Sequence, residues 1–175
     1  MNPATADALA LFESDGPIPK DRVLGWMGAP DLGTRGVVFS IISEAWDRVS
    51  PGLTMDEAAP FGADYLLECL ALDQETDDHV MCGFEAGRAL SVWLKSLAEY
   101  DSAGPILRGV AQRLADMYRN ADEKTRNRIE TGAVEHILEW PALRPYFAFW
   151  AQDPMLKQAH EECMAWGLAH EGGEW

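Results

Sequence analysis

The stretch VVFSIISEAWDRV, residues 37–49, decides the fold class of this chain. Its apolar residues recur in pairs four apart, which is the period of an amphipathic helix, and the pattern lasts for about three turns. The β-branched residues between Val37 and Ile42 are also compatible with a strand, but a strand pattern does not keep this period. The spacing therefore predicts a helix that begins after Thr34 and ends at Ser50-Pro51-Gly52, a strong helix stop.

The next stretch of sequence holds three further helix-start signals. Thr54-Met-Asp-Glu57 has the form of a capping box, in which a hydroxyl and a carboxylate satisfy each other's free backbone amides. The Pro60 that follows predicts a short turn and then a helix from about residue 60 to residue 72. Thr76 is followed by two aspartates, which favour the positive end of a helix, and predicts a long buried helix from there.

The second half of the chain contains further helix starts of the same kinds. Gly104-Pro105 opens one helix, Asp122 caps another, and a last helix follows Asp153-Pro154. No segment alternates between apolar and polar residues as a half-buried strand would. We expect an all-α fold with about seven or eight helices, as an antiparallel bundle or a short stack of helical hairpins. Residues 1–175 should form a single helical domain, with 1–33 a less regular segment.

The composition excludes several functional classes. With a net charge of -15, the surface repels phosphate backbones and anionic membranes, so we expect no direct nucleic-acid binding and no membrane binding. The first ten residues lack the basic region of a secretory signal, and no apolar run approaches the ~20 residues that span a bilayer. The odd number of cysteines, Cys69, Cys82 and Cys163, indicates reduced thiols. We therefore expect a cytoplasmic protein.

Acidic side chains dominate the sequence between Arg48 and Arg88, which contains no Lys or Arg. Such a stretch cannot neutralise itself locally and predicts a negative surface that attracts a basic protein. We expect the partner-binding residues to be Asp56, Glu57, Asp64, Glu68, Asp73, Glu75, Asp77 and Asp78. The alternative interpretation is solubility, with partial compensation by the basic residues between Arg108 and Arg128.

Residues with catalytic or metal-binding chemistry are present but poorly organised. His79 and Cys82, and likewise His160 and Cys163 with His170 nearby, have a spacing that can chelate zinc when four ligands converge. On an apolar helix face, however, a core thiol and a hydrogen-bonded imidazole are the ordinary finding. No nucleophile elbow and no phosphate loop occurs. We expect no catalytic residue, no metal site and no cofactor.

One resemblance makes the functional expectation more specific. The segment Gly132-Ala-Val-Glu135-His136-Ile-Leu-Glu139, the proline after it, an aromatic cluster at 146–150 and Asp153-Pro154 resemble the C-terminal half of small helical bacterial proteins associated with polymorphic toxin systems. Some members of that group are regarded as immunity proteins. The resemblance implies a cytoplasmic, non-enzymatic helical protein that binds a cognate toxin, and it transfers no binding residue to this chain.

We therefore expect an acidic immunity protein that neutralises a bacterial toxin by direct binding, with a basic toxin domain as its partner. The alternative is a small helical enzyme or ligand-binding domain whose pocket is lined by one of the histidines and by tryptophans. The tryptophans available for such a pocket are Trp26, Trp46, Trp93, Trp140, Trp150, Trp166 and Trp175.

Overall fold

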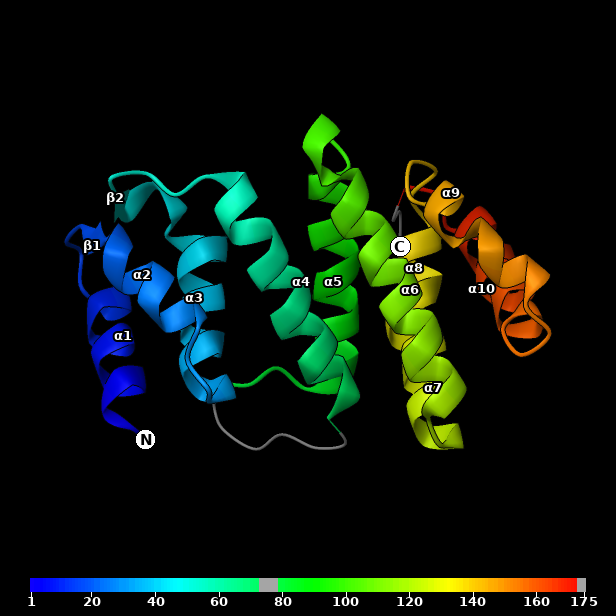
Figure 1. Ribbon diagram of the computed structural model, residues 1–175, viewed down its shortest axis with the longest axis horizontal. Coiled ribbons are helices and arrows are strands. Elements are labelled where there is room, and N and C mark those ends of the chain that lie inside the picture. The colour runs from blue at the N-terminus through cyan, green and yellow to red at the C-terminus, as the bar shows by residue number, and fades with distance from the viewer. Residues whose placement is uncertain (73–78, 173–175) are drawn as a thin grey trace. The chain divides into compact units, whose positions relative to one another are not determined.

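The computed structural model describes residues 1–72 and 79–172, and it confirms the all-α class (Figure 1). Across these ranges the regular structure is helical, except for one parallel pair of two-residue strands in which Ile18 lies opposite Val49. None of the helices in the described ranges combines the length and the hydropathy that crossing a bilayer requires.

The described residues divide into two compact units. Unit 1 comprises residues 1–65 and 79–81, and unit 2 comprises residues 66–72 and 82–172. Unit 1 holds α1 (Pro3–Glu13), β1 (Ile18–Pro19), α2 (Lys20–Met27), α3 (Leu32–Glu44), the 3₁₀ turn η1 (Trp46–Arg48), β2 (Val49–Ser50) and the first part of α4 (Met55–Ala71). Unit 2 holds the end of α4, then α5 (Gly83–Leu97), η2 (Asp101–Ala103), α6 (Gly104–Asn120), α7 (Glu123–Ile129), η3 (Glu130–Val134), α8 (Glu135–Leu138), α9 (Arg144–Phe147), η4 (Ala148–Gln152) and α10 (Lys157–Ala169).

The segment 1–33 is more regular than predicted, because it contains α1 and α2. The Asn2 side chain caps α1 by accepting the Thr5 amide at 2.9 Å. Thr5 and Thr34 are both buried, and their hydroxyl oxygens lie 2.8 Å apart, so they join α1 to α3. The helix predicted to begin after Thr34 begins earlier, at Leu32, because Asp31 caps α3 by accepting the Thr34 amide at 2.8 Å.

The helix predicted to continue to Val49 ends at Glu44. Val49 instead pairs with Ile18, and both side chains are almost completely buried. The intervening Arg48 donates hydrogen bonds to the carbonyl oxygens of Leu11, at 2.8 Å, and Phe12, at 2.9 Å, in the last turn of α1. Tertiary packing in unit 1 therefore overrides the helical period of this segment.

The prediction that Pro60 separates a turn from a new helix is wrong. α4 runs without interruption from Met55 to Ala71. Pro60 lacks the amide that would bond to the carbonyl of Asp56, but it is exposed, so water can satisfy that carbonyl. Apolar side chains on either side, including the buried Ala59 and Phe61, hold the helix together by packing. The capping box at Thr54 is confirmed, because the Thr54 amide donates to the Glu57 carboxylate at 2.8 Å.

The predicted helix start at Thr76 lies outside the described residues, but the helix that follows begins only at Gly83. In unit 1, the Tyr65 hydroxyl bonds to the carbonyl of His79 and to the amide of Met81, both at 3.3 Å. These bonds hold residues 79–81 in a non-helical conformation. The helix starts at Gly104 and after the Asp122 cap are confirmed, and Asp122 accepts the Thr125 amide at 2.8 Å.

In unit 2, α7, η3 and α8 form one continuous helix with a π-helical turn in its centre. The Glu135 amide bonds to the carbonyl of Glu130, five residues earlier, so the turn holds one residue more than an α-turn. Every residue from Arg128 to Glu139 is buried or half-buried.

Candidate functional site

Of the eight acidic residues predicted to bind a partner, four lie in the part of the chain that the structure describes. Asp56, Asp64 and Glu68 are exposed on α4, and each also interacts with another group of the protein. Glu57 is half-buried. The other four, Asp73, Glu75, Asp77 and Asp78, lie outside the described residues.

Glu57 is bound within unit 1. Its carboxylate lies 2.8 Å from the Lys20 ammonium and accepts hydrogen bonds from the amide and the hydroxyl of Thr54. The hydrogen bond from Lys20 and those from Thr54 lower the pKa of Glu57 to about 2. This carboxylate links α2 to the start of α4, so it has a structural role.

A second acidic surface, which the sequence analysis missed, lies at one end of unit 1. We call it the acidic end, and it comprises Glu13, Asp15, Asp21, Glu44 and Asp47, all of them exposed. Figure 1 shows that α1 and α3 end, and α2 begins, beside the β1–β2 pair. Across the part of the chain that the structure describes, none of these five carboxylates makes a hydrogen bond or an ion pair.

Two of these carboxylates occupy positions that disfavour negative charge. Glu13 is the last residue of α1 and Glu44 the last of α3, and neither helix has a basic residue in its last turn. Because a helix macrodipole is negative at its C-terminus, a carboxylate there destabilises the helix by a few tenths of a kcal/mol up to about 1 kcal/mol. At Glu44 this cost has no compensation on α3, whereas the Arg48 guanidinium supplies positive charge at the end of α1. This signal is readable from the sequence once the helix ends are known.

The cations nearest in sequence leave this surface negative. Lys20 is paired with Glu57, and Arg22 is paired with Asp7. The Arg48 guanidinium points into backbone carbonyls, since it also bonds to the carbonyl oxygen of Gly16 at 3.2 Å. Arg48 thus neutralises the C-terminus of α1 rather than a carboxylate.

An aromatic side chain lies beside these carboxylates. Trp46, in η1, is half-buried and lies between Glu44 and Asp47 in the sequence. Its indole N–H makes no hydrogen bond to any residue that the structure describes. A partly exposed Trp with a free N–H is the kind of side chain that anchors protein interfaces.

The histidine–cysteine pairs do not form a metal site among the described residues, where no group of three or more candidate ligands comes together. His79 and Cys82 lie outside the helix that was predicted to align them. Cys163 is buried, and burial raises the pKa of its thiol, which keeps it protonated. His160 is also buried; burial lowers its pKa, and its Nε2 has no hydrogen-bond partner among the described residues.

A buried polar network in unit 2 connects the segment that carries the resemblance to α10. Glu139 is 2% exposed, and its Oε1 lies 2.8 Å from Nδ1 of His136 and 3.2 Å from the indole nitrogen of Trp166. The Trp166 ring stacks on His170, with ring centroids 4.0 Å apart. The network joins α8 to α10. His136 and Glu139 are both buried, so the network fixes how α8 packs on α10.

No protein-family profile, no curated protein and no solved structure matches this chain.

Proposed function

We propose that this protein is a non-enzymatic, acidic binding protein whose acidic end docks a basic protein. The observation that carries the proposal is the gathering of five exposed carboxylates at one end of unit 1, none of them paired within the described residues. One of them, Glu44, lies at the C-terminus of α3, where a carboxylate costs helix stability. A partner with a basic surface would offset that cost on binding. Complementary charge of this kind accelerates encounter and fixes orientation.

The acidic end also offers an anchor for affinity. Buried aromatic side chains contribute most of the binding energy in protein interfaces, and charges at the rim contribute mainly to the association rate. Trp46, flanked by Glu44 and Asp47, combines the two features. We expect its ring to be covered by the partner.

The more specific proposal is an immunity protein that binds and neutralises a toxin domain. The resemblance of residues 132–154 supports this role, and the charge of -15 supports a basic toxin, such as a nuclease with a phosphate-binding cleft. In this proposal the acidic end takes the place of the nucleic acid in that cleft.

The test begins with co-expression. Each reading frame beside the gene in its native locus is expressed with and without this protein, and growth is recorded. A neighbouring frame that stops growth alone, and permits growth when this protein is present, supplies the partner. If no neighbouring frame is toxic, or if none is rescued, the immunity role is wrong.

Charge reversal then tests the docking surface. The triple variant E13K/E44K/D47K should slow association with the rescued toxin by about tenfold or more at low salt. It should remain folded, because all three positions are exposed and a lysine at the C-terminus of α3 favours that helix. The control E85K/E99K/E123K makes the same charge change at exposed positions of unit 2. Equal effects of the two variants would show that net charge, and not the acidic end, drives binding.

A Trp/His-lined ligand pocket, the alternative function, has less support. Trp26 and Trp150 are buried in the cores of their units, and His136 and His160 are buried as well. The pocket in unit 2 that Arg108 and Gln112 line contains neither a tryptophan nor a histidine.

A further inference from the structure

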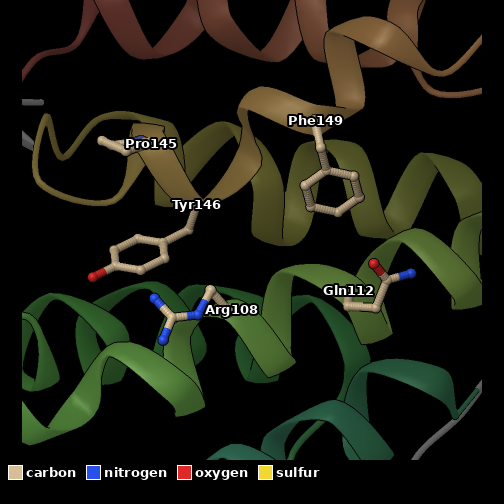
Figure 2. A pocket seen from close by; sticks show the side chains of 5 residues that line it. All are labelled: Arg108, Gln112, Pro145, Tyr146 and Phe149. Atoms are coloured by element: carbon tan, nitrogen blue, oxygen red, sulfur yellow. The ribbon is translucent and has the colours of Figure 1, made fainter.

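An open pocket of about 500 Å³ lies in unit 2 between α6 and the α9–η4 segment. Figure 2 shows Arg108 and Gln112 on α6, with the rings of Tyr146 and Phe149 across from them; Pro145, next to Tyr146, completes the lining. The volume falls within the range of about 300–1,000 Å³ that is typical of small-molecule sites.

The helical period explains why two aromatic rings face this space. Phe147 and Trp150 are 1% and 0% exposed and lie in the core of unit 2. Tyr146 and Phe149 each precede one of these residues, so they project from another side of the same turns. Phe149 is 36% exposed, and its ring lies above Gln112 in Figure 2.

Arg108 differs from every other cation in the described residues, because it makes no hydrogen bond, ion pair or ring contact there. On the same helix, Arg119 is held by Asp116 and Asp153. The basic residues between Arg108 and Arg128 are candidates to compensate the acidic stretch, but Arg108 itself pairs with no carboxylate that the structure describes. In a chain with a net charge of -15, a guanidinium without a carboxylate partner is conspicuous.

The amide of Gln112 is oriented by its neighbour. Its Nε2 donates to Oδ1 of Asp116 at 3.0 Å, so its Oε1 remains available as an acceptor. The pocket thus presents one cation, one acceptor, and two rings that can stack on a flat ligand. The Tyr146 hydroxyl also makes no hydrogen bond to the described part of the chain.

We propose that this pocket binds a small aromatic carboxylate. The ligand's carboxylate pairs with Arg108, its ring stacks against Tyr146 and Phe149, and a hydroxyl or N–H substituent donates to Oε1 of Gln112. A single guanidinium matches one negative charge, and a carboxylate accepts its two parallel N–H bonds. A doubly charged phosphate would require more cations than the pocket offers. This site is independent of the acidic end and of the toxin-binding proposal.

The probe for this site is 4-hydroxyphenylacetate, which carries a carboxylate, a ring and a hydroxyl donor. Titration of the full chain, followed by amide chemical shifts, should give saturable changes centred on Arg108, Gln112 and residues 145–149. The uncharged 4-hydroxyphenylacetamide should bind about tenfold or more weakly, since a hydrogen bond to a charged group is lost.

Variants separate the pocket from general charge effects. R108Q should weaken binding of the acid about tenfold or more and abolish the difference between acid and amide. The control R113Q removes the same charge from an exposed position of α6 outside the pocket and should leave binding unchanged. Because Arg108 is exposed and without a partner among the described residues, R108Q should keep the wild-type unfolding midpoint, which is measured in parallel.

Any of the following outcomes would overturn the proposal. The first is equal binding of acid and amide, or equal effects of R108Q and R113Q. The second is tighter binding of phenyl phosphate than of the carboxylate, which would make the site a phosphate site. The third is much tighter binding of the peptide Gly-Gly-Tyr with a free C-terminus, which would show that the site takes a protein's C-terminus.

Discussion

In unit 2, the backbone of Gly87 in α5 lies directly against the carbonyl group of Gly132 in the π-helical turn η3. A Cβ added at Gly87 would press on that carbonyl and would lie 3.0 Å from the backbone nitrogen of Ala133. Because the neighbouring atoms are backbone, they cannot move aside as a flexible side chain would. The two helices depend on this close approach.

Gly87→Ala should therefore destabilise the protein, by about 1–3 kcal/mol, as overpacking does. Gly109→Ala is the matched control, because Gly109 is also inside a helix but an added Cβ there meets nothing within 4 Å. It should stabilise the protein by up to about 1 kcal/mol, since alanine favours a helix. Urea unfolding followed by circular dichroism measures both changes. Similar effects of the two substitutions would contradict the close packing of α5 on η3.

Glu57 should make the stability of unit 1 depend on acid pH. Its pKa is about 2 in the folded protein and 4.5 as its ordinary value, so its contribution is fully present above pH 4.5. That contribution decreases as the pH falls from 4.5 towards 2, where the folded-state carboxylate is protonated as well. E57Q should be less stable than the wild type at pH 7, and the difference should shrink at pH 3. Unfolding midpoints that differ by the same amount at both pH values would refute this assignment.

The buried network of Glu139 should tolerate an amide better than a truncation. E139A leaves the ring nitrogen of His136 and the indole N–H of Trp166 without their acceptor, and should cost about 3 kcal/mol. E139Q keeps an oxygen for Trp166 and should cost about half as much. Urea unfolding gives both values, and the fluorescence of Trp166 should shift in E139A. Equal and small costs would show that the network contributes little to packing.

Arg128 should require its guanidinium. It is 3% exposed, and it donates to the carbonyl oxygens of Leu70 at 2.8 Å and Ala71 at 3.3 Å, at the C-terminus of α4. A lysine carries all its donors on one nitrogen and cannot span the two carbonyls as Nε and Nη2 of the guanidinium do, so R128K should destabilise unit 2 by about 1–3 kcal/mol. R113K, at an exposed position of α6, serves as the control and should be neutral. Hydrogen exchange of the last turn of α4 should accelerate in R128K alone.

The helical period predicted the all-α class because it reports directly on which face of a segment is buried. It failed where contacts distant in sequence decide the local conformation. Val49 leaves the helix to pair with Ile18, and the hydroxyl of Tyr65 holds residues 79–81 out of a helix. Neither partner can be identified from the local sequence. At Pro60 the error is the opposite: the sequence predicts a break, but the helix continues. Packing of the buried neighbours outweighs one missing hydrogen bond.

The acidic surface, too, could be predicted from the sequence only in part. A run of carboxylates between two arginines is visible in the sequence, but the pairing of Glu57 with Lys20 depends on the fold. The acidic end was missed because Glu13 and Glu44 are far apart in the chain, and only the fold brings the ends of α1 and α3 to the same end of unit 1. The pocket at Arg108 was missed for the same reason, since residues 108–112 form one wall, residues 145–149 form the other, and the two are distant in the sequence.

The π-helical turn makes the length of its segment more important than its composition. Deleting one residue between Glu130 and Val134 would restore an ordinary α-turn and rotate everything after it by ~100° about the helix axis. The carboxylate of Glu139 would then point away from Trp166, and α8 would present a different face to α10. Exchange of side chains along this segment is a local change, whereas loss of a single peptide unit shifts the register of the whole C-terminal half of unit 2.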